Sequence, residues 1–235
     1  MPIHKEGGGY QWGNRGKLYH GHNANEKAEK QAAAAHANGY RGDAVTDEPK
    51  KCADSKPMTE WDAIQGVRNG SLPSPSRYGG MWLFAVRVTG TGISFRPQHN
   101  EWVYRPPEYY LNDEFLERVK GLPILMMHTE DGPVQGEEYR QKNIGNLVAP
   151  WIRNSDVWGI AKVYNDDDAQ LIIEYFSSTS PSVSFDERGE STYVEAPDGK
   201  KMLVEGAPDF IDHLAMVPAG VWDRFGPPSG VSFDY

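Results

Sequence analysis

The chain has 235 residues, a formal charge of −9 at neutral pH, and 25 Gly with 17 Pro. Its length suits one catalytic domain plus an appendage, and its Gly and Pro content predicts many turns. The acidic balance disfavours phosphate-driven nucleic-acid binding, which needs clustered Lys and Arg. The single cysteine, Cys52, excludes an intrachain disulfide and a cysteine-based zinc site. Because no apolar run reaches transmembrane length, we expect a soluble cytoplasmic protein without membrane contact.

Residues 1–42 form a predicted leader module, and their Ala-rich stretch predicts a helix over 24–38. Residues 43–80 follow as a predicted linker, polar over 43–57 and Pro-rich over 72–76. A short helix over 59–67 interrupts this linker, since Trp61, Ile64 and Val67 are spaced for one helical face.

The main domain is predicted over 81–225, with a tail over 226–235. Alternating apolar residues predict a strand over 81–90, with Leu83, Ala85 and Arg87 on one face. The further expected elements are a helix over 111–119, a strand over 123–127, a hairpin over 143–164, a helix after 166–168, a strand over 180–185, a hairpin over 193–204 and a strand over 213–217. This mixture predicts an α+β domain whose mostly antiparallel sheet is curved, like a β-barrel, with a few short helices.

Three residues attract attention as possible catalytic groups. His128 follows a buried strand and precedes a polar turn, a position that suits a general base. Ser182 alternates with apolar residues, and a serine becomes a nucleophile only where a histidine reaches it. His213 begins a buried strand, as either a core histidine or an orienting residue for His128. Asp212 is the alternative orienting residue, and strand alternation predicts that only one of the two points at His128.

The order of these residues, together with the motifs around them, resembles the prohead proteases of tailed phages, which are related to the herpesvirus assembly proteases. The motifs that carry the resemblance are Pro123 to His128, Asn143-Ile144-Gly145-Asn146, Asp166 to Phe176, Ser182-Val183-Ser184-Phe185, His213-Leu214-Ala215-Met216-Val217, and the leader patch from Trp12 to Tyr19. The resemblance covers most of residues 108–220. It implies a serine endopeptidase in which Ser182 is the nucleophile, His128 the general base and His213 the orienting residue.

Two departures from the family pattern leave alternatives open. The family has Gly two residues after its serine, whereas this chain has Ser184, so Ser184 is a second candidate for the nucleophile. The family also carries an Arg after its last strand, near the oxyanion site. Here Arg224 stands slightly later, and the backbone N–H groups of Ala219 and Gly220 are the other candidate oxyanion donors.

The resemblance further implies substrates and partners. The expected substrates are phage scaffold and major capsid proteins inside the assembling prohead, and the chain itself at the polar segments 43–57 and 72–79. A homodimer is implied, and neither a cofactor nor a resident metal. One alternative is a non-catalytic scaffold or inner-capsid protein that retains the protease fold. A second is a metallohydrolase that uses His128, His213 and the acidic run 166–168, although no short ligand spacing favours it.

Overall fold

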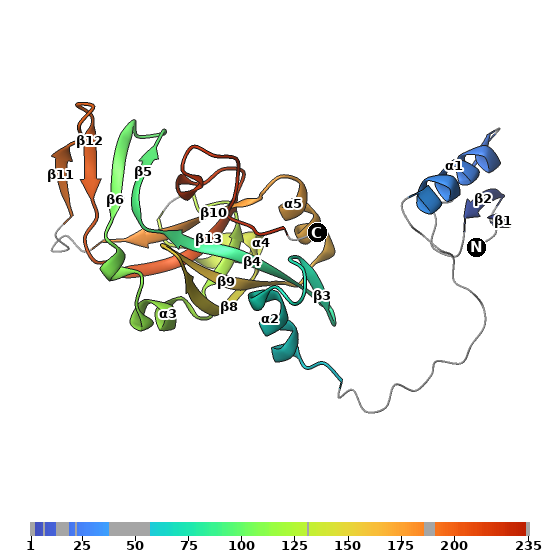
Figure 1. The fold of residues 1–235 in the computed structure, drawn as a ribbon, viewed down its shortest axis with the longest axis horizontal. Helices are drawn as coiled ribbons and strands as arrows, with labels where there is room; N and C mark the ends of the chain where they lie inside the picture. Colours follow the sequence, from blue (N-terminus) through green and yellow to red (C-terminus); the bar gives the residue numbers. More distant parts are fainter. Residues whose placement is uncertain are drawn as a thin grey trace. The chain divides into compact units, whose positions relative to one another are not determined.

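A computed structural model describes residues 3–6, 8–12, 19–21, 23–37, 57–130, 132–185 and 191–233. The chain divides into two compact units, Met1–Lys56 and Pro57–Tyr235 (Figure 1). The polar stretch 43–56 and Cys52 lie outside the described residues. The predicted linker segment 57–80 therefore belongs to the larger unit.

The smaller unit contains a β-hairpin, formed by β1 (Ile3–Glu6) and β2 (Gly9–Trp12), and the helix α1 (Ala24–Ala37). The helix matches the one predicted over 24–38. Tyr10 and Tyr19 exchange two backbone hydrogen bonds of 2.9 Å. Ala24 and Ala28, one helical turn apart, are both buried, and α1 contacts β2. Small side chains thus allow the helix to approach the hairpin closely.

The larger unit has the predicted α+β class and contains two mixed sheets (Figure 1). The main sheet has the spatial order β10 (Ser178–Ser184), β13 (Phe210–Val217), β7 (Pro123–Met126), β8 (Asn143–Arg153), β9 (Asp156–Val163), β4 (Met81–Gly90) and β3 (Ser76–Tyr78). The second sheet has the order β11 (Thr192–Glu195), β12 (Lys201–Val204), β6 (Glu101–Arg105) and β5 (Gly92–Arg96). The helices are α2 (Glu60–Asn69), α3 (Asp113–Val119), α4 (Gly136–Lys142) and α5 (Asp166–Glu174), with short 3₁₀ turns η1 (Pro107–Tyr109) and η2 (Val221–Asp223).

The main sheet is not a closed barrel, because β10 and β3 are its two edges. The gap between β4 and β10 is instead spanned by the end of the chain. The backbones of Gly230 and Ser232 hydrogen-bond to β4 at 2.7 and 2.8 Å, while the N–H of Val231 donates to the carbonyl of Ser177 at 3.0 Å. Part of the predicted tail 226–235 therefore lies between β4 and β10 and connects them by backbone hydrogen bonds.

Both faces of β4 are covered, as its alternation predicts. Phe84, Val86 and Val88 face the main core, which α3 and α5 also line. Leu83 and Ala85 face a second cluster that α2 completes. This packing explains why residues 57–80 are no free linker, since α2 buries its apolar face against β4, β9 and β3.

Three local features can be compared directly with the predictions from the sequence. The helix predicted over 111–119 is α3, and the side chain of Asn112 caps it by accepting a hydrogen bond of 2.8 Å from Phe115 N. The predicted hairpin over 143–164 is β8 and β9, which turn at Asn154 and Ser155. Trp61 differs from expectation, because its side chain is 59% exposed and does not share the buried face of α2.

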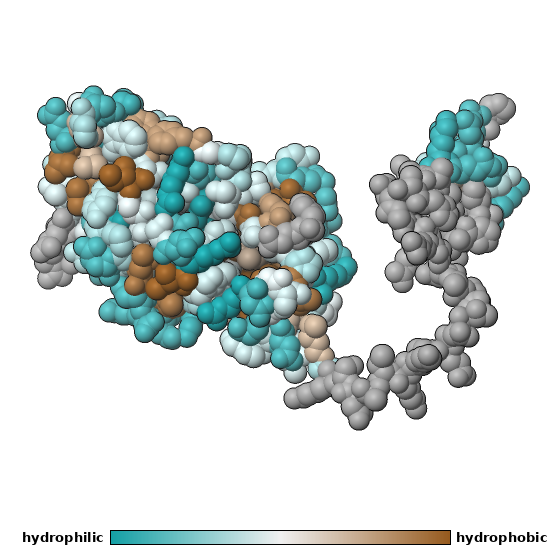
Figure 2. Space-filling model, in the orientation of Figure 1, coloured by the Kyte–Doolittle hydropathy of each residue, from teal (hydrophilic) through white to brown (hydrophobic). Residues whose placement is uncertain are grey.

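The end of the larger unit that carries the four-stranded sheet exposes apolar side chains. Ile93 is 56% exposed, Val194 41% and Phe225 75%, and Figure 2 shows brown patches over this end. Phe225 stacks on Phe95, with ring centroids 5.9 Å apart. No helix within the described ranges is long and apolar enough to cross a membrane.

Candidate active site

His128 follows a sharp turn at the end of β7. Met127 has a positive φ of 68°, a conformation that a side chain other than glycine adopts at a cost of about 1–2 kcal/mol. Its N–H still donates to the carbonyl of Met216 on β13 at 3.1 Å. The turn takes the chain out of the sheet directly before His128. The imidazole of His128 then lies against His213, with ring centroids 5.2 Å apart.

The helix α4 holds the loop that carries His128. The Nζ atom of Lys142 donates to the carbonyl of His128 at 2.7 Å and to Oε1 of Glu138 at 2.6 Å. The same Oε1 accepts the N–H of Glu130 at 2.9 Å. Two backbone groups of the loop are thus fixed to one helix, which restricts the positions that the imidazole can take.

His213 is fully buried, and both of its ring nitrogens have partners. Its Nε2 lies 3.1 Å from Nδ1 of His128, and its Nδ1 lies 2.6 Å from Oδ2 of Asp212. The expectation that only one of Asp212 and His213 points at His128 holds for direct contact, and His213 is that residue. Asp212 reaches His128 only through His213.

A β-bulge explains how two consecutive residues meet. Ser182 pairs with His213, but the next residue, Val183, pairs with Ile211, so Asp212 is an extra residue on β13. A bulge suspends the regular alternation of side chains between the two faces. The prediction that alternation sends Asp212 and His213 to opposite faces is therefore wrong at this position.

Ser182 is the serine that faces the histidine pair. It lies directly opposite His213 in the antiparallel pairing of β10 and β13. Residues paired in this way share a face, with Cβ atoms about 4.5–5.5 Å apart. Ser184 lies beyond the bulge, opposite Phe210, and is exposed. Position alone therefore favours Ser182 over Ser184 as the nucleophile.

Ser182 and His128 both neighbour His213 but are not hydrogen-bonded to each other. Among the described residues, neither the hydroxyl of Ser182 nor Nε2 of His128 has a hydrogen-bond partner in the protein. Catalytic hydrogen bonds are often long in a free enzyme and tighten when substrate binds. The arrangement leaves the proton-accepting nitrogen of His128 available on the side away from His213.

The surroundings of His128 favour its neutral form. Burial lowers the pKa of His128 below its ordinary value of 6.5, and the charges of His213 and Lys142 lower it further. A neutral imidazole can accept a proton, whereas an imidazolium cannot. His128 is therefore in the form that a general base needs at neutral pH.

Two of the three expected oxyanion donors, Gly220 and Arg224, have other partners. The N–H of Gly220 donates to Oδ2 of Asp223 at 2.7 Å, and Gly220 packs against the carbonyl of Thr179. Thr179 lies three residues before Ser182 on β10, about 10 Å along an extended strand. Arg224 binds the carboxylate of Asp156 at 2.8 Å, across the turn between β8 and β9. Both groups hold the fold together at other places.

A recess of about 210 Å³ adjoins the residues on either side of Ser182. Ser180, Pro181 and Val183 form its wall on β10. Arg105 and Glu205 line it from the second sheet, where Arg105 Nη2 donates to Glu205 Oε1 at 3.0 Å. The recess mixes apolar side chains such as Val183 and Trp222 with polar ones such as Arg96 and His99. It adjoins β10, but Ser182 itself is not among its lining residues.

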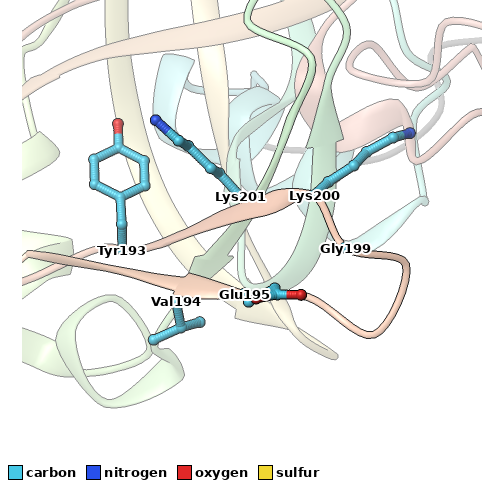
Figure 3. A pocket seen from close by; sticks show the side chains of 6 residues that line it. All are labelled: Tyr193, Val194, Glu195, Gly199, Lys200 and Lys201. Carbon is cyan, nitrogen blue, oxygen red and sulfur yellow. The ribbon is translucent and has the colours of Figure 1, made fainter.

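A second concavity, of about 280 Å³, lies on the β11–β12 hairpin. Figure 3 shows that Tyr193 and Lys201 point to one side of the hairpin, whereas Val194 points to the other. The Nζ atom of Lys201 lies 5.9 Å from the ring centroid of Tyr193. None of its lining residues is a Ser, Cys or His, so this concavity holds no serine or cysteine nucleophile and no histidine base.

The acidic residues 166–168 form the first turn of α5. The carboxylate of Asp166 accepts from Nε1 of Trp82 at 2.7 Å and from Arg77 at 3.2 Å. Acidic residues in the first turn also complement the helix dipole. Within the described residues, no group of three or more His, Cys, Asp or Glu side chains is arranged to hold a metal ion.

We found no protein-family model, no curated protein and no solved structure that matches this chain significantly. The assignment of roles therefore rests on the geometry of the chain itself. That geometry places His128, which follows β7, in contact with His213 on β13, and pairs His213 with Ser182 on the neighbouring strand β10.

Sequence reasoning missed the groups that hold the histidine pair. Lys142 and Glu138 were not considered, although their i,i+4 spacing is the signal of a helical ion pair. The contact between Val134 N and Oδ2 of Asp212, at 2.8 Å, joins residues 78 positions apart. No local pattern reveals such a contact.

Proposed function

We propose that this protein is a serine endopeptidase that cleaves scaffold and capsid proteins during the maturation of a phage head. The observation that carries the proposal is the 3.1 Å contact between Nδ1 of His128 and Nε2 of His213, directly beside the position of Ser182. A serine, a base and a group that orients the base are the parts that acyl transfer requires. The motif order resembles that of prohead proteases, which work inside the prohead in the host cytoplasm.

The proposed reaction has two stages. Nε2 of His128 takes the hydroxyl proton of Ser182 while Oγ attacks the scissile carbonyl, and the same proton then passes to the leaving amine. Water repeats the sequence on the acyl-enzyme and releases the new carboxylate. His213 accepts a hydrogen bond from Nδ1 of His128 throughout, which keeps Nε2 directed at Ser182. The recess beside β10 would receive a substrate side chain.

Self-cleavage fits only one of the two segments that the sequence suggested. The segment 72–79 is built into the fold, because Ser74 is buried and accepts the N–H of Ala85 at 2.9 Å, while β3 pairs with β4. The polar stretch 43–57, nearly all of it outside the described residues, has the polar composition typical of cleaved segments. A cut there would separate the leader from the larger unit.

Co-expression of the full chain with the capsid and scaffold proteins of its phage tests the proposal. Intact masses are measured for wild type, His128→Ala, Ser182→Ala and Ser184→Ala. We expect trimmed products with wild type and Ser184→Ala, and full-length chains with the other two. If heads assemble and every chain stays at full length with wild type, the protein is a non-catalytic scaffold or inner-capsid component instead. Within the part of the chain that the structure describes, the Ser182 hydroxyl makes no hydrogen bond, and this observation favours the second candidate.

A further inference from the structure

Asp212 is the end of a continuous chain of hydrogen-bonding groups. Its Oδ2 atom lies 2.6 Å from Nδ1 of His213 and accepts the N–H of Val134 at 2.8 Å. His213 is completely buried and continues the chain to His128 at 3.1 Å. The bulge on β13 makes this possible, because it places the side chains of two adjacent residues in contact. The chain therefore runs from a carboxylate through two imidazoles toward Ser182.

The chemistry of Asp212 decides where the protons lie. An ionised carboxylate only accepts hydrogen bonds, so the proton between it and His213 sits on Nδ1 of His213. Nε2 of a neutral His213 is then an acceptor, and Nδ1 of His128 must be the donor to it. Nε2 of His128 is left with its lone pair, which is the tautomer that can take the proton of Ser182.

We infer that Asp212 is a positioning residue that fixes the tautomers of His213 and His128. This inference rests on the proposed function and deepens it, because the carboxylate acts on Ser182 only through the two imidazoles. A neutral histidine orients a base weakly, whereas a carboxylate also stabilises the imidazolium that forms in the transition state. The arrangement is a Ser-His-Asp triad that is lengthened by one imidazole.

The charged and titratable groups around His128 come from two elements. His213 and Asp212 lie on β13, and Lys142 and Glu138 on α4. Of these, Asp212 alone touches His213, so replacing it removes one negative charge from the chain of imidazoles. Loss of that charge makes the His128 imidazolium less favourable. The acidic limb of the rate profile then moves to lower pH.

A fluorophosphonate–rhodamine probe measures the reactivity of Ser182 without a known substrate. Its phosphorus bonds to Oγ, fluoride leaves, and the hydroxyl proton passes to Nε2 of His128. Asp212→Asn keeps an oxygen at the same place but loses the charge, and Asp212→Ala loses both. We expect labelling to slow about tenfold with Asn and about 100-fold with Ala. Asp209→Asn, an exposed residue on the same approach to β13, is the matched control and should label at the wild-type rate.

A second measurement does not depend on reactivity. Nitrogen-15 NMR of the histidine rings identifies the protonated nitrogen of His213 and the pKa of His128, with His128→Ala and His213→Ala for assignment. We expect the proton on Nδ1 of His213 in wild type and a lower pKa of His128 in Asp212→Asn, together with a labelling profile shifted to lower pH. If Asp212 had only a structural role, its replacement would lower the amplitude of labelling without shifting the acidic limb of the pH profile.

The outcomes separate the inference from the proposed function. If wild type is labelled at Ser182 but Asp212→Asn and Asp212→Ala keep its rate and its pH profile, the positioning role is wrong and the protease proposal stands. If wild type is not labelled, the protease proposal fails. The NMR result then still decides about Asp212, because an unchanged His128 pKa in Asp212→Asn overturns the inference.

Discussion

Ser178 and Ser182 lie four residues apart on β10, each beside a different polar network. The two networks differ in whether their last group has a hydrogen-bond partner. The hydroxyl of Ser178 is buried and donates to the carboxylate of Asp223 at 2.7 Å. That carboxylate also binds Arg87, Gly220 and Ser229, and so holds together segments distant in the chain. The network at Ser182 runs from Asp212 to His128 and ends at a nitrogen without a partner among the described residues. A saturated network stabilises the fold, whereas an open one can exchange a proton.

The largest expected effect is on the rate of labelling, which should depend on Ser182 and not on Ser178. Ser182→Ala should reduce fluorophosphonate labelling by at least about a thousandfold, because the nucleophile is lost. Its free energy of unfolding should stay within about 0.5 kcal/mol of wild type, since its hydroxyl has no hydrogen-bond partner among the described residues. Ser178→Ala should still be labelled. Labelling of the Ser182→Ala protein at the wild-type rate would assign the nucleophile elsewhere.

The second effect is on stability and concerns Asp223. Its carboxylate lies 2.6 Å from Nη2 of Arg87, and both side chains are buried. Asp223→Ala leaves the Arg87 cation without its closest partner, which should cost about 3–5 kcal/mol. Urea unfolding measures this, with the exposed Asp209→Ala as control. A loss below about 1 kcal/mol would mean that the seam between β4 and β10 does not depend on this carboxylate.

Ser178→Ala should have a smaller effect of the same kind. It removes one donor from Asp223, whose carboxylate keeps its other partners, so the expected loss is about 1–2 kcal/mol in the free energy of unfolding. Equal losses for Ser178→Ala and Ser182→Ala in urea unfolding would contradict the division between the two networks.

The smallest effect is a shift in pH dependence. Lys142 lowers the pKa of His128, so Lys142→Gln should raise that pKa, while burial still keeps it below 6.5. The acidic limb of the labelling profile then moves to higher pH, the opposite direction from Asp212→Asn. Lys120→Gln, an exposed lysine paired with Glu117, is the control. An unchanged limb in Lys142→Gln would show that the cation does not act on His128.

The same lowered pKa links stability to pH. The unfolded chain binds a proton at His128 near pH 6.5, whereas the folded chain binds it only at lower pH. Stability should therefore decrease as the pH falls from about 6.5 toward the folded pKa, and His128 adds no further decrease below it. In His128→Ala this part of the decrease should be absent from urea unfolding measured across the pH range.

Local patterns predicted much of the fold because they reflect local physics. They predicted the strand β4, the hairpin of β8 and β9, and the helix α3. The bulge at Asp212 and the positive φ of Met127 escaped prediction, since both depart from what their sequences prefer. Such departures are maintained by contacts distant in sequence, and two of them lie at the candidate site.

The most direct test of the central claim maps the residue that reacts with fluorophosphonate–rhodamine. The full chain is labelled at neutral pH, digested and analysed by mass spectrometry, beside His128→Ala and His213→Ala. The account predicts that the probe is found on Ser182 in wild type, that His128→Ala abolishes labelling and that His213→Ala slows it. Labelling of Ser184, or of Ser182 at an equal rate in wild type and His128→Ala, would contradict it.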